Sequence, residues 1–235
     1  EINSTFNMSG GSIKNNTAFS SAGVFIGTNC TFNMSGGSIT GNTATNGEGG
    51  VLFTNDGTAT FKLSGDVTIS DNVTKIDIDE IGVHETYPSN MVIPDNVTIE
   101  VVDALTGEGK IYVQIGTSRV FTNSTGSVKA KDYIDKFVSD SRMYRIKTEG
   151  DELRIESPHL VIGGTFVYDD NAADVFGDGK VKFTPASGEN SNATLTLNGY
   201  QYDGTEVSER EGIVYFDNIP LDIVWENENM LVVNK

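Results

Sequence analysis

Acidic side chains are the groups in this 235-residue chain whose chemistry could carry a reaction. Enzymes that cleave acidic polysaccharides need either carboxylates that hold calcium beside a basic residue, or a pair of acids for hydrolysis. Asp132, Asp135 and Asp140 are the candidate acids outside the repeated part of the sequence. One hypothesis is therefore a fragment of a polysaccharide lyase or glycoside hydrolase that uses these acids.

Two further sets of side chains have the chemistry of metal ligands. Asp77, Asp79 and Glu80 alternate on an expected loop, and an acidic surface turn accounts for them without a cation. His84 and His159 lie far apart in the sequence and lack any metal-ligand spacing. Both histidines are therefore predicted to be ordinary surface residues.

Residues 174–180 resemble the first half of an EF-hand or dockerin calcium loop, with aspartates at positions 1 and 5 and a glycine at position 6. Phe176 stands at position 3 and Pro185 at position 12, so the third and twelfth ligands are lost. We predict a glycine-rich turn before a strand that starts at Lys180. We expect no metal and no other cofactor in this chain.

A repeat supplies the scaffold that must position any functional group. Residues 6–13 return letter for letter as residues 32–39, and a looser third copy spans residues 61–69. A period of roughly 26 to 29 residues indicates a solenoid or an array. Apolar and polar residues alternate within each copy, which is typical of a strand with one buried face. The prediction is an all-β parallel β-helix of about three to four coils, because so small a unit must stack to bury its apolar face.

Equivalent residues of the three copies are expected to stack between coils about 5 Å apart. Those predicted to point inward are Phe6, Phe32 and Phe61, then Met8, Met34 and Leu63, then Ile13, Ile39 and Ile69. Asn16, Asn42 and Asn72 follow the isoleucines by three residues in every copy. Their side-chain amides are predicted to form a ladder at one corner of the coil.

A second strand is expected in each coil. Residues 23–26 match residues 50–53, and residues 81–83 are the predicted third member of this set. Residues 87–115 still alternate in places and are interpreted as the last, irregular coil.

The predicted solenoid needs a cap, because a bare last coil would present unpaired strand groups to other chains. Residues 129–138 place Tyr133, Ile134, Phe137 and Val138 at helical spacing and are predicted to form a capping helix. A hairpin is predicted from residues 144–147 and 152–155.

The repeat carries a family resemblance. Gly-Gly-Ser-Ile, followed by residues 41–44 and then Gly-Gly-Val, resembles the repeats of bacterial cell-surface proteins with a pectin-lyase-like right-handed β-helix, of the gut-bacterial, adhesin-like type. It is also similar to repeats of polymorphic outer-membrane proteins, but their Phe-x-x-Asn motif is missing. The resemblance covers about residues 1–85, and it implies a right-handed helix on a cell surface.

A domain boundary is predicted at Ser157 and Pro158, with a capped β-helix in residues 1–157 and a small all-β module in residues 158–235. Residues 160–164, 177–183 and 193–198 resemble the start of a second module common in the same surface proteins. Trp225 is the only tryptophan. It alternates with Leu221 and Ile223, so it is predicted to pack in a core.

The composition limits the partners. A formal net charge of −17 excludes nucleic acid and anionic membranes, because clusters of Lys and Arg that neutralise phosphates are absent. The single cysteine, Cys30, is expected to pack inward as a thiol. No secretory signal or membrane-spanning run is present. The chain is interpreted as part of a longer extracellular protein whose targeting segments lie elsewhere.

The leading hypothesis for function is a non-catalytic extracellular or cell-surface module of a larger protein. Such a module would act in adhesion or in binding of a host or dietary glycan or of a surface protein, beside further domains of the same chain. The alternatives are the lyase or hydrolase fragment described above and a purely structural stalk. No catalytic residue is assigned under the leading hypothesis.

Overall fold

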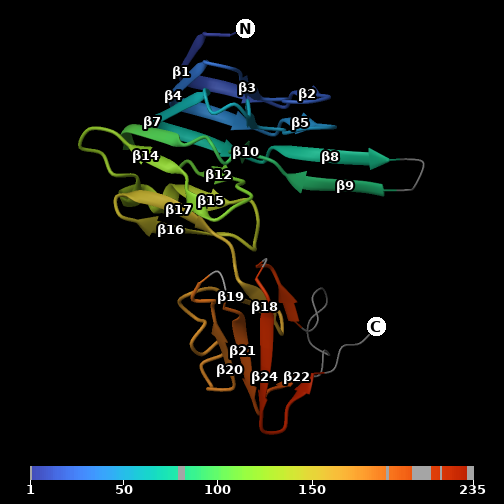
Figure 1. The fold of residues 1–235 in the computed structure, drawn as a ribbon. Coiled ribbons are helices and arrows are strands. Elements are labelled where there is room, and N and C mark those ends of the chain that lie inside the picture. The colour runs from blue at the N-terminus through green and yellow to red at the C-terminus, as the bar shows by residue number, and fades with distance from the viewer. Residues whose placement is uncertain (1, 79–82, 189–190, 203–212, 218, 232–235) are drawn as a thin grey trace. The chain divides into compact units, whose positions relative to one another are not determined.

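The computed structural model describes the chain except for residues 1, 79–82, 189–190, 203–212, 218 and 232–235 (Figure 1). The chain divides into two compact units, Glu1–Glu156 and Ser157–Lys235. Each unit has its own buried apolar cluster.

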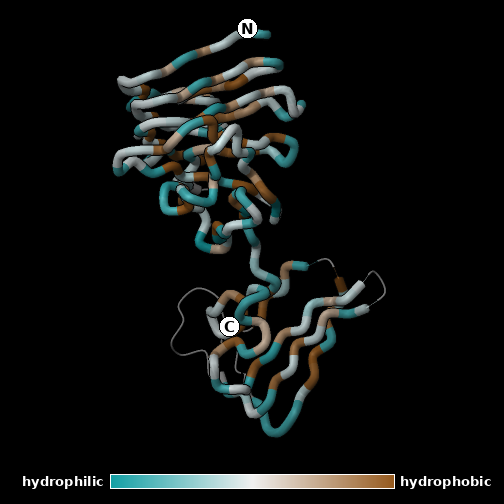
Figure 2. The backbone as a smooth tube through the Cα atoms, turned by 90° about the vertical axis from the view of Figure 1, so that its left-hand side faces the viewer, coloured by the Kyte–Doolittle hydropathy of each residue, from teal (hydrophilic) through white to brown (hydrophobic). Residues whose placement is uncertain are grey.

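The first unit is a β-solenoid of about seven turns with parallel sheets. Figure 2 shows the stacked, parallel course of its chain. Its main sheet has seven strands, and the path through five of them is β1-β4-β7-β11-β14. The strands of this sheet are β1 (Thr5–Lys14), β4 (Thr31–Thr40), β7 (Thr60–Ser70), β11 (Ile99–Leu105), β12 (Ile111–Val113), β14 (Thr122–Ser124) and β15 (Phe137–Ser139).

Three smaller sheets complete the coils. One joins β3 (Val24–Ile26), β6 (Val51–Phe53) and β10 (Met91–Val92), and another joins β2 (Thr17–Ala18), β5 (Thr43–Ala44), β8 (Val73–Ile78) and β9 (Val83–Pro88). The third is antiparallel and joins β13 (Arg119–Val120), β16 (Arg145–Glu149) and β17 (Glu152–Glu156). The predicted hairpin is therefore present as β16 and β17.

The stacked phenylalanines follow the repeat. Phe6 pairs with Phe32 and Phe32 with Phe61, and neighbouring ring centroids are 5.1 and 5.0 Å apart with nearly parallel planes. Phe32 and Phe61 are buried, but Phe6 lies on the first coil and is 49% exposed. All three rings lie in one stack, and Phe6 is exposed on its outer side because no described coil covers it.

The other predicted repeat residues also lie in register. Met8 pairs with Met34 and Met34 with Leu63, and all three are buried. Ile39 and Ile69 are fully buried, whereas Ile13 on the first coil is partly buried. Burial therefore increases from the first coil to the second.

The asparagines form a continuous ladder that points one way. The backbone N–H and the Nδ2 of Asn16 donate to Asn42 Oδ1, and the same two groups of Asn42 donate to Asn72 Oδ1. Asn72 donates likewise to Asn90 Oδ1, and Asn90 donates to both carboxylate oxygens of Asp140. Asn42 and Asn72 are completely buried, whereas Asn16 is exposed.

The solenoid is longer than the expected three to four coils. Ile99 stacks on Phe61 and Thr122 on Ile99, although neither residue copies the repeated letters. Stacking requires an inward side chain in register and not a particular residue type. The interpretation of residues 87–115 as the last coil is also wrong, because β14 and β15 follow them in the main sheet.

The third strand of the β3 sheet lies later in the sequence than expected. Met91 and Val92 pair with Val51 and Leu52, whereas Val83 belongs to β9, and Ile81 and Gly82 lie outside the described residues. Strands β8 and β9 form an antiparallel hairpin that extends away from the stack (Figure 1). Because this hairpin is inserted before β10, the third strand lies at residues 91–92 and not at residues 81–83.

The predicted capping helix is shorter and of another type. Residues Ala130–Lys136 form a 3-10 helix, η2, and Phe137 and Val138 belong to β15. Pairing of Phe137 with Ile111 and of Val138 with Tyr112 draws these two residues into the main sheet. Tertiary pairing here overrides the helical spacing of the apolar residues.

The second unit is built from short strands. One sheet joins β18 (Leu160–Ile162), β19 (Thr165–Val167) and β23 (Ile213–Tyr215), and another joins β20 (Val181–Thr184), β21 (Ala193–Asn198) and β24 (Leu221–Glu226). A pair of short strands, β22 (Gln201–Tyr202) and β25 (Met230–Leu231), accompanies them.

Trp225 does not pack in a core as predicted, since 53% of it is exposed, and Ile223 is 41% exposed. Strand β24 is the outer strand of its sheet and pairs with β21 alone within the described part of the unit. Only Leu221 at its start packs against the buried cluster. The alternating pattern was correct for a strand but did not reveal that this strand lies at an edge.

Candidate functional site

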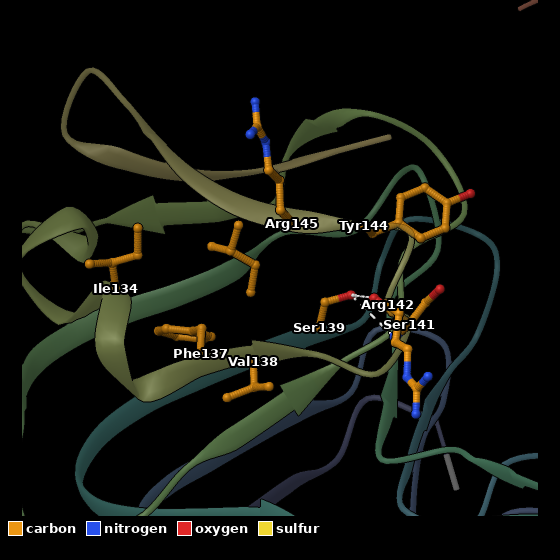
Figure 3. Close-up of a pocket in the computed structure, with 9 residues that line it drawn as sticks. Ile134, Phe137, Val138, Ser139, Ser141, Arg142, Tyr144 and Arg145 are labelled. Atoms are coloured by element: carbon orange, nitrogen blue, oxygen red, sulfur yellow. Dashed lines mark hydrogen bonds between the residues drawn. The ribbon is translucent and has the colours of Figure 1, made fainter. Parts of the chain in front are cut away.

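A hollow of about 360 Å³ lies beside the cap of the solenoid (Figure 3). We call it the cap groove. The end of η2, strand β15, the following loop and the start of β16 supply its lining, which consists of Ile134, Phe137, Val138, Ser139, Ser141, Arg142, Tyr144, Arg145 and Ile146. The segments that close the solenoid therefore also build a concave surface beside it.

The two serines of the cap groove hold its loop in place. Ser139 Oγ donates to the Ser141 carbonyl at 3.0 Å and accepts from the Ser141 N–H at 3.3 Å. Ser141 Oγ accepts from the N–H of Met143. The hydroxyl of Tyr144 donates to the Gly116 carbonyl at 3.2 Å, which fixes the phenol ring at the rim.

The charged groups of the cap groove are both arginines. Arg145 donates from Nε to Glu156 at 2.5 Å, and Lys147 lies 3.2 Å from the other oxygen of the same carboxylate. Arg142 is exposed and points to the opposite side from Arg145 (Figure 3). The lining contains no carboxylate.

This arrangement offers apolar, aromatic and positively charged contacts to a ligand. Ile134, Phe137 and Val138 provide an apolar floor, and Tyr144 provides an aromatic edge with a polar tip. Arg142 adds a positive charge that favours carboxylate or sulfate groups on a ligand. Hydrolysis by paired acids would need two carboxylates across the groove, which its lining does not supply.

The three acids named as catalytic candidates have separate surroundings. Asp132 and Asp135 lie exposed on η2, while Asp140 is partly buried and accepts two hydrogen bonds from Asn90. Burial raises the pKa of Asp140 above its ordinary value, and the Asn90 hydrogen bonds oppose this. Asp140 follows Phe137 by the same three residues that separate Asn72 from Ile69, a signal that could have placed it on the ladder.

The candidate cation ligands are not brought together. Asp77 lies in strand β8 opposite His84 and not on a loop, and Asp79 and Glu80 lie outside the described residues. Across the described part of the chain, no three side chains of His, Cys, Asp or Glu are grouped to hold a metal ion.

The 174–180 segment forms a turn that its own aspartates close. Asp174 accepts hydrogen bonds from the N–H groups of Asp178 and Gly179, and Asp178 accepts one from Lys180. Gly177 and Gly179 both have a φ of 73°. Strand β20 begins directly afterwards, at Val181. Backbone groups thus occupy the carboxylates that an EF-hand would turn toward calcium.

Cys30 is buried, at 8% exposure, and its thiol donates to the Thr28 carbonyl at 3.5 Å. The side chain points inward next to the first phenylalanines, as the register of the sequence indicated.

His159 is not the plain surface residue that was expected. Its side chain is 22% exposed, with Nδ1 3.0 Å from Asp217 and Nε2 2.8 Å from Asp169. Burial lowers the His159 pKa, but hydrogen bonds to Asp169 and then Asp217 outweigh burial and raise the pKa above 6.5. Metal-ligand spacing could not reveal this cluster, because its aspartates follow two different strands, β19 and β23.

The His159 cluster predicts that the second unit is more stable in mild acid. A raised folded-state pKa contributes stability that is fully present below the unfolded pKa and is lost as pH rises through the folded pKa. We therefore expect a higher melting temperature for this unit at about pH 5.5 than at about pH 8. The measurement is thermal unfolding followed by Trp225 fluorescence at both pH values.

The control for this experiment is a pair of histidine variants. His159→Gln should reduce the difference between the two pH values, while His84→Gln, in strand β9 of the first unit, should leave it in place. Equal melting temperatures of the wild-type unit at both pH values would contradict the assignment.

No protein-family model, curated protein or solved structure matches this chain. In the described part of the chain, no helix has the length and apolar character needed to span a membrane.

Proposed function

We propose that the chain is a non-catalytic extracellular module of a larger surface protein, which presents the cap groove to a glycan or protein ligand. The observation that carries this proposal is the lining of the groove, which has an apolar floor, the Tyr144 ring held by Gly116, and Arg142, and which contains no carboxylate. Aromatic and arginine side chains are the groups that contribute most to binding surfaces.

The solenoid supports the same proposal. Its inward side chains stack on one another, so the interior serves the scaffold, and ligand contacts are left to outward surfaces and to the cap. We further propose a right-handed helix and a separate C-terminal all-β module of the kind that accompanies such surface proteins. The net charge of the whole chain, −17, suits an extracellular location. On so acidic a protein, the two arginines of the groove form a local positive region.

A glycan array tests this function. Wild-type protein is expected to bind a subset of glycans, with a preference for those that carry carboxylate or sulfate groups. Tyr144→Ala should weaken that binding about tenfold or more, because it removes the aromatic edge. Tyr87→Ala provides the matched control, since Tyr87 is exposed on β9, away from the groove.

The same protein sample distinguishes the alternatives. Depolymerisation of a pectin-like substrate that is lost in Asp132→Asn, Asp135→Asn or Asp140→Asn would replace the binding function with an enzymatic one. If the protein binds no glycan in the array and no ligand in a protein-ligand screen, and if it cleaves no substrate in the digestion assay, a structural stalk would be favoured.

A further inference from the structure

The first coil of the solenoid has an open upper face. A hollow of about 210 Å³ lies there between β1 and β3 and reaches the edge of the interior at Cys30 and Phe32. Phe6, Phe19 and Phe25 are 49%, 70% and 58% exposed on this coil. The equivalent of Phe6 in the next coil, Phe32, is 1% exposed. Phe6 is thus left uncovered at this end, although its equivalent in the next coil is buried.

Gly10 indicates that the open face is shaped to receive another coil. Its repeat equivalent, Gly36, must be glycine because a Cβ there would lie 2.9 Å from the Ser9 carbonyl oxygen of the coil above. A Cβ on Gly10 would meet no atom within 4 Å, and its φ is not positive. Neither the backbone conformation nor any described neighbour requires a glycine at position 10. A further coil stacked on β1 would place a backbone carbonyl oxygen next to Gly10, and that oxygen would leave no room for a Cβ.

The asparagine ladder gives the orientation of the missing neighbour. Asn42 Oδ1 and Asn72 Oδ1 each accept two hydrogen bonds from the coil that precedes them. Asn16 donates in the same sense but has no described coil ahead of it to donate to its own Oδ1. The face therefore presents an acceptor, and its complement must present an N–H and an amide Nδ2 in parallel register.

We propose that the first coil is a docking surface for one more coil of the same repeat, on the same polypeptide and in parallel register. A phenylalanine of that coil lies over Phe6, a methionine over Met8, and an asparagine donates to Asn16. This coil continues the interface already present between β1 and β4.

A second copy of the chain fits this face less well. Two first coils meeting face to face would oppose Asn16 acceptors with no donors, and their strands could not both run in parallel register. The lower end of another copy is not open either, because η2 and the β16–β17 hairpin contact the last strands there.

The experiment adds the coil to the full chain. A copy of residues 5–30 placed directly before Thr5 creates a junction from Cys30 to Thr5, which repeats the natural junction from Cys30 to Thr31, since both are followed by Phe-Asn-Met-Ser. Hydrogen exchange by mass spectrometry should show amides of residues 5–14 exchanging roughly tenfold more slowly than in the original chain. Unchanged exchange in β1, or loss of structure in the extended protein, would overturn the proposal.

Gly10→Ala provides the decisive variant. It should leave the thermal unfolding of the original chain unchanged, and it should remove most of the added protection in the extended chain. Gly36→Ala in the original chain is the reference for the second effect, because its carbonyl neighbour is already in place. Equal effects of Gly10→Ala in both chains would contradict a stacked coil. A concentration-dependent dimer of the original chain that Phe6→Ala dissociates would show instead that a second copy occupies the face.

Discussion

Phe32→Ala is expected to lower the free energy of unfolding of the first unit by about 3–5 kcal/mol. The Phe32 ring is 1% exposed and lies between two rings at 5.1 and 5.0 Å, so its removal opens a cavity that neither neighbour can fill by moving toward the other. Urea denaturation followed by far-UV circular dichroism measures the loss.

Phe6→Ala is the matched control for that prediction. Phe6 contacts Phe32 on one side only and is about half exposed, so the same truncation should cost clearly less. Equal losses at the two positions would mean that stacking inside the solenoid does not determine the contribution of these rings.

Asn72→Leu is expected to lower the free energy of unfolding by about 3 kcal/mol or more, because each buried polar group left unpaired costs about 1–3 kcal/mol. Asn72 Oδ1 accepts from Asn42, and its Nδ2 donates to the carbonyl of Ile39 and to Asn90. Leucine has a similar size but restores none of these bonds, and Asn42 and Asn72 are both inaccessible to water. Hydrogen exchange in β4 and β7 would locate the destabilisation.

Asn16→Leu removes a member of the same ladder where water can replace it. Asn16 is exposed and only donates to Asn42, so we expect its replacement to cost less than about 1 kcal/mol. A large loss at Asn16 together with a small one at Asn72 would show that burial does not set the strength of the ladder.

Stacking could be predicted where the sequence repeats itself. Phe32, Met34, Ile39 and Asn42 have identical or similar residues 26 residues before and 29 or 30 residues after them, and the structure places them next to these copies. The later turns could not be predicted in this way, because Thr122 occupies a stacking position without resembling Phe61. A solenoid interior accepts many residue types, so sequence similarity disappears before the structural repeat ends.

The candidate site depends on contacts that a single sequence does not display. The cap groove requires β15 to pair with β12, which the helical spacing of Ile134 and Phe137 concealed. Likewise, Asp169 and Asp217, which contact His159, follow two different strands. Trp225 was assigned to a core because alternation identifies a strand but not its place in the sheet. In each case the missing information is which distant segments become neighbours.

The β8–β9 hairpin shows that one coil can be longer than its neighbours without changing how the coils stack. The chain leaves the stack after Thr74 and returns to the ladder at Asn90. Asn72 and Asn90 are nevertheless hydrogen-bonded neighbours in the ladder. A coil can therefore lengthen outward without altering the registers above and below it. Evolution or a protein engineer can use this position as a graft site, where a guest peptide between the two hairpin strands would be displayed at the side of an unchanged scaffold.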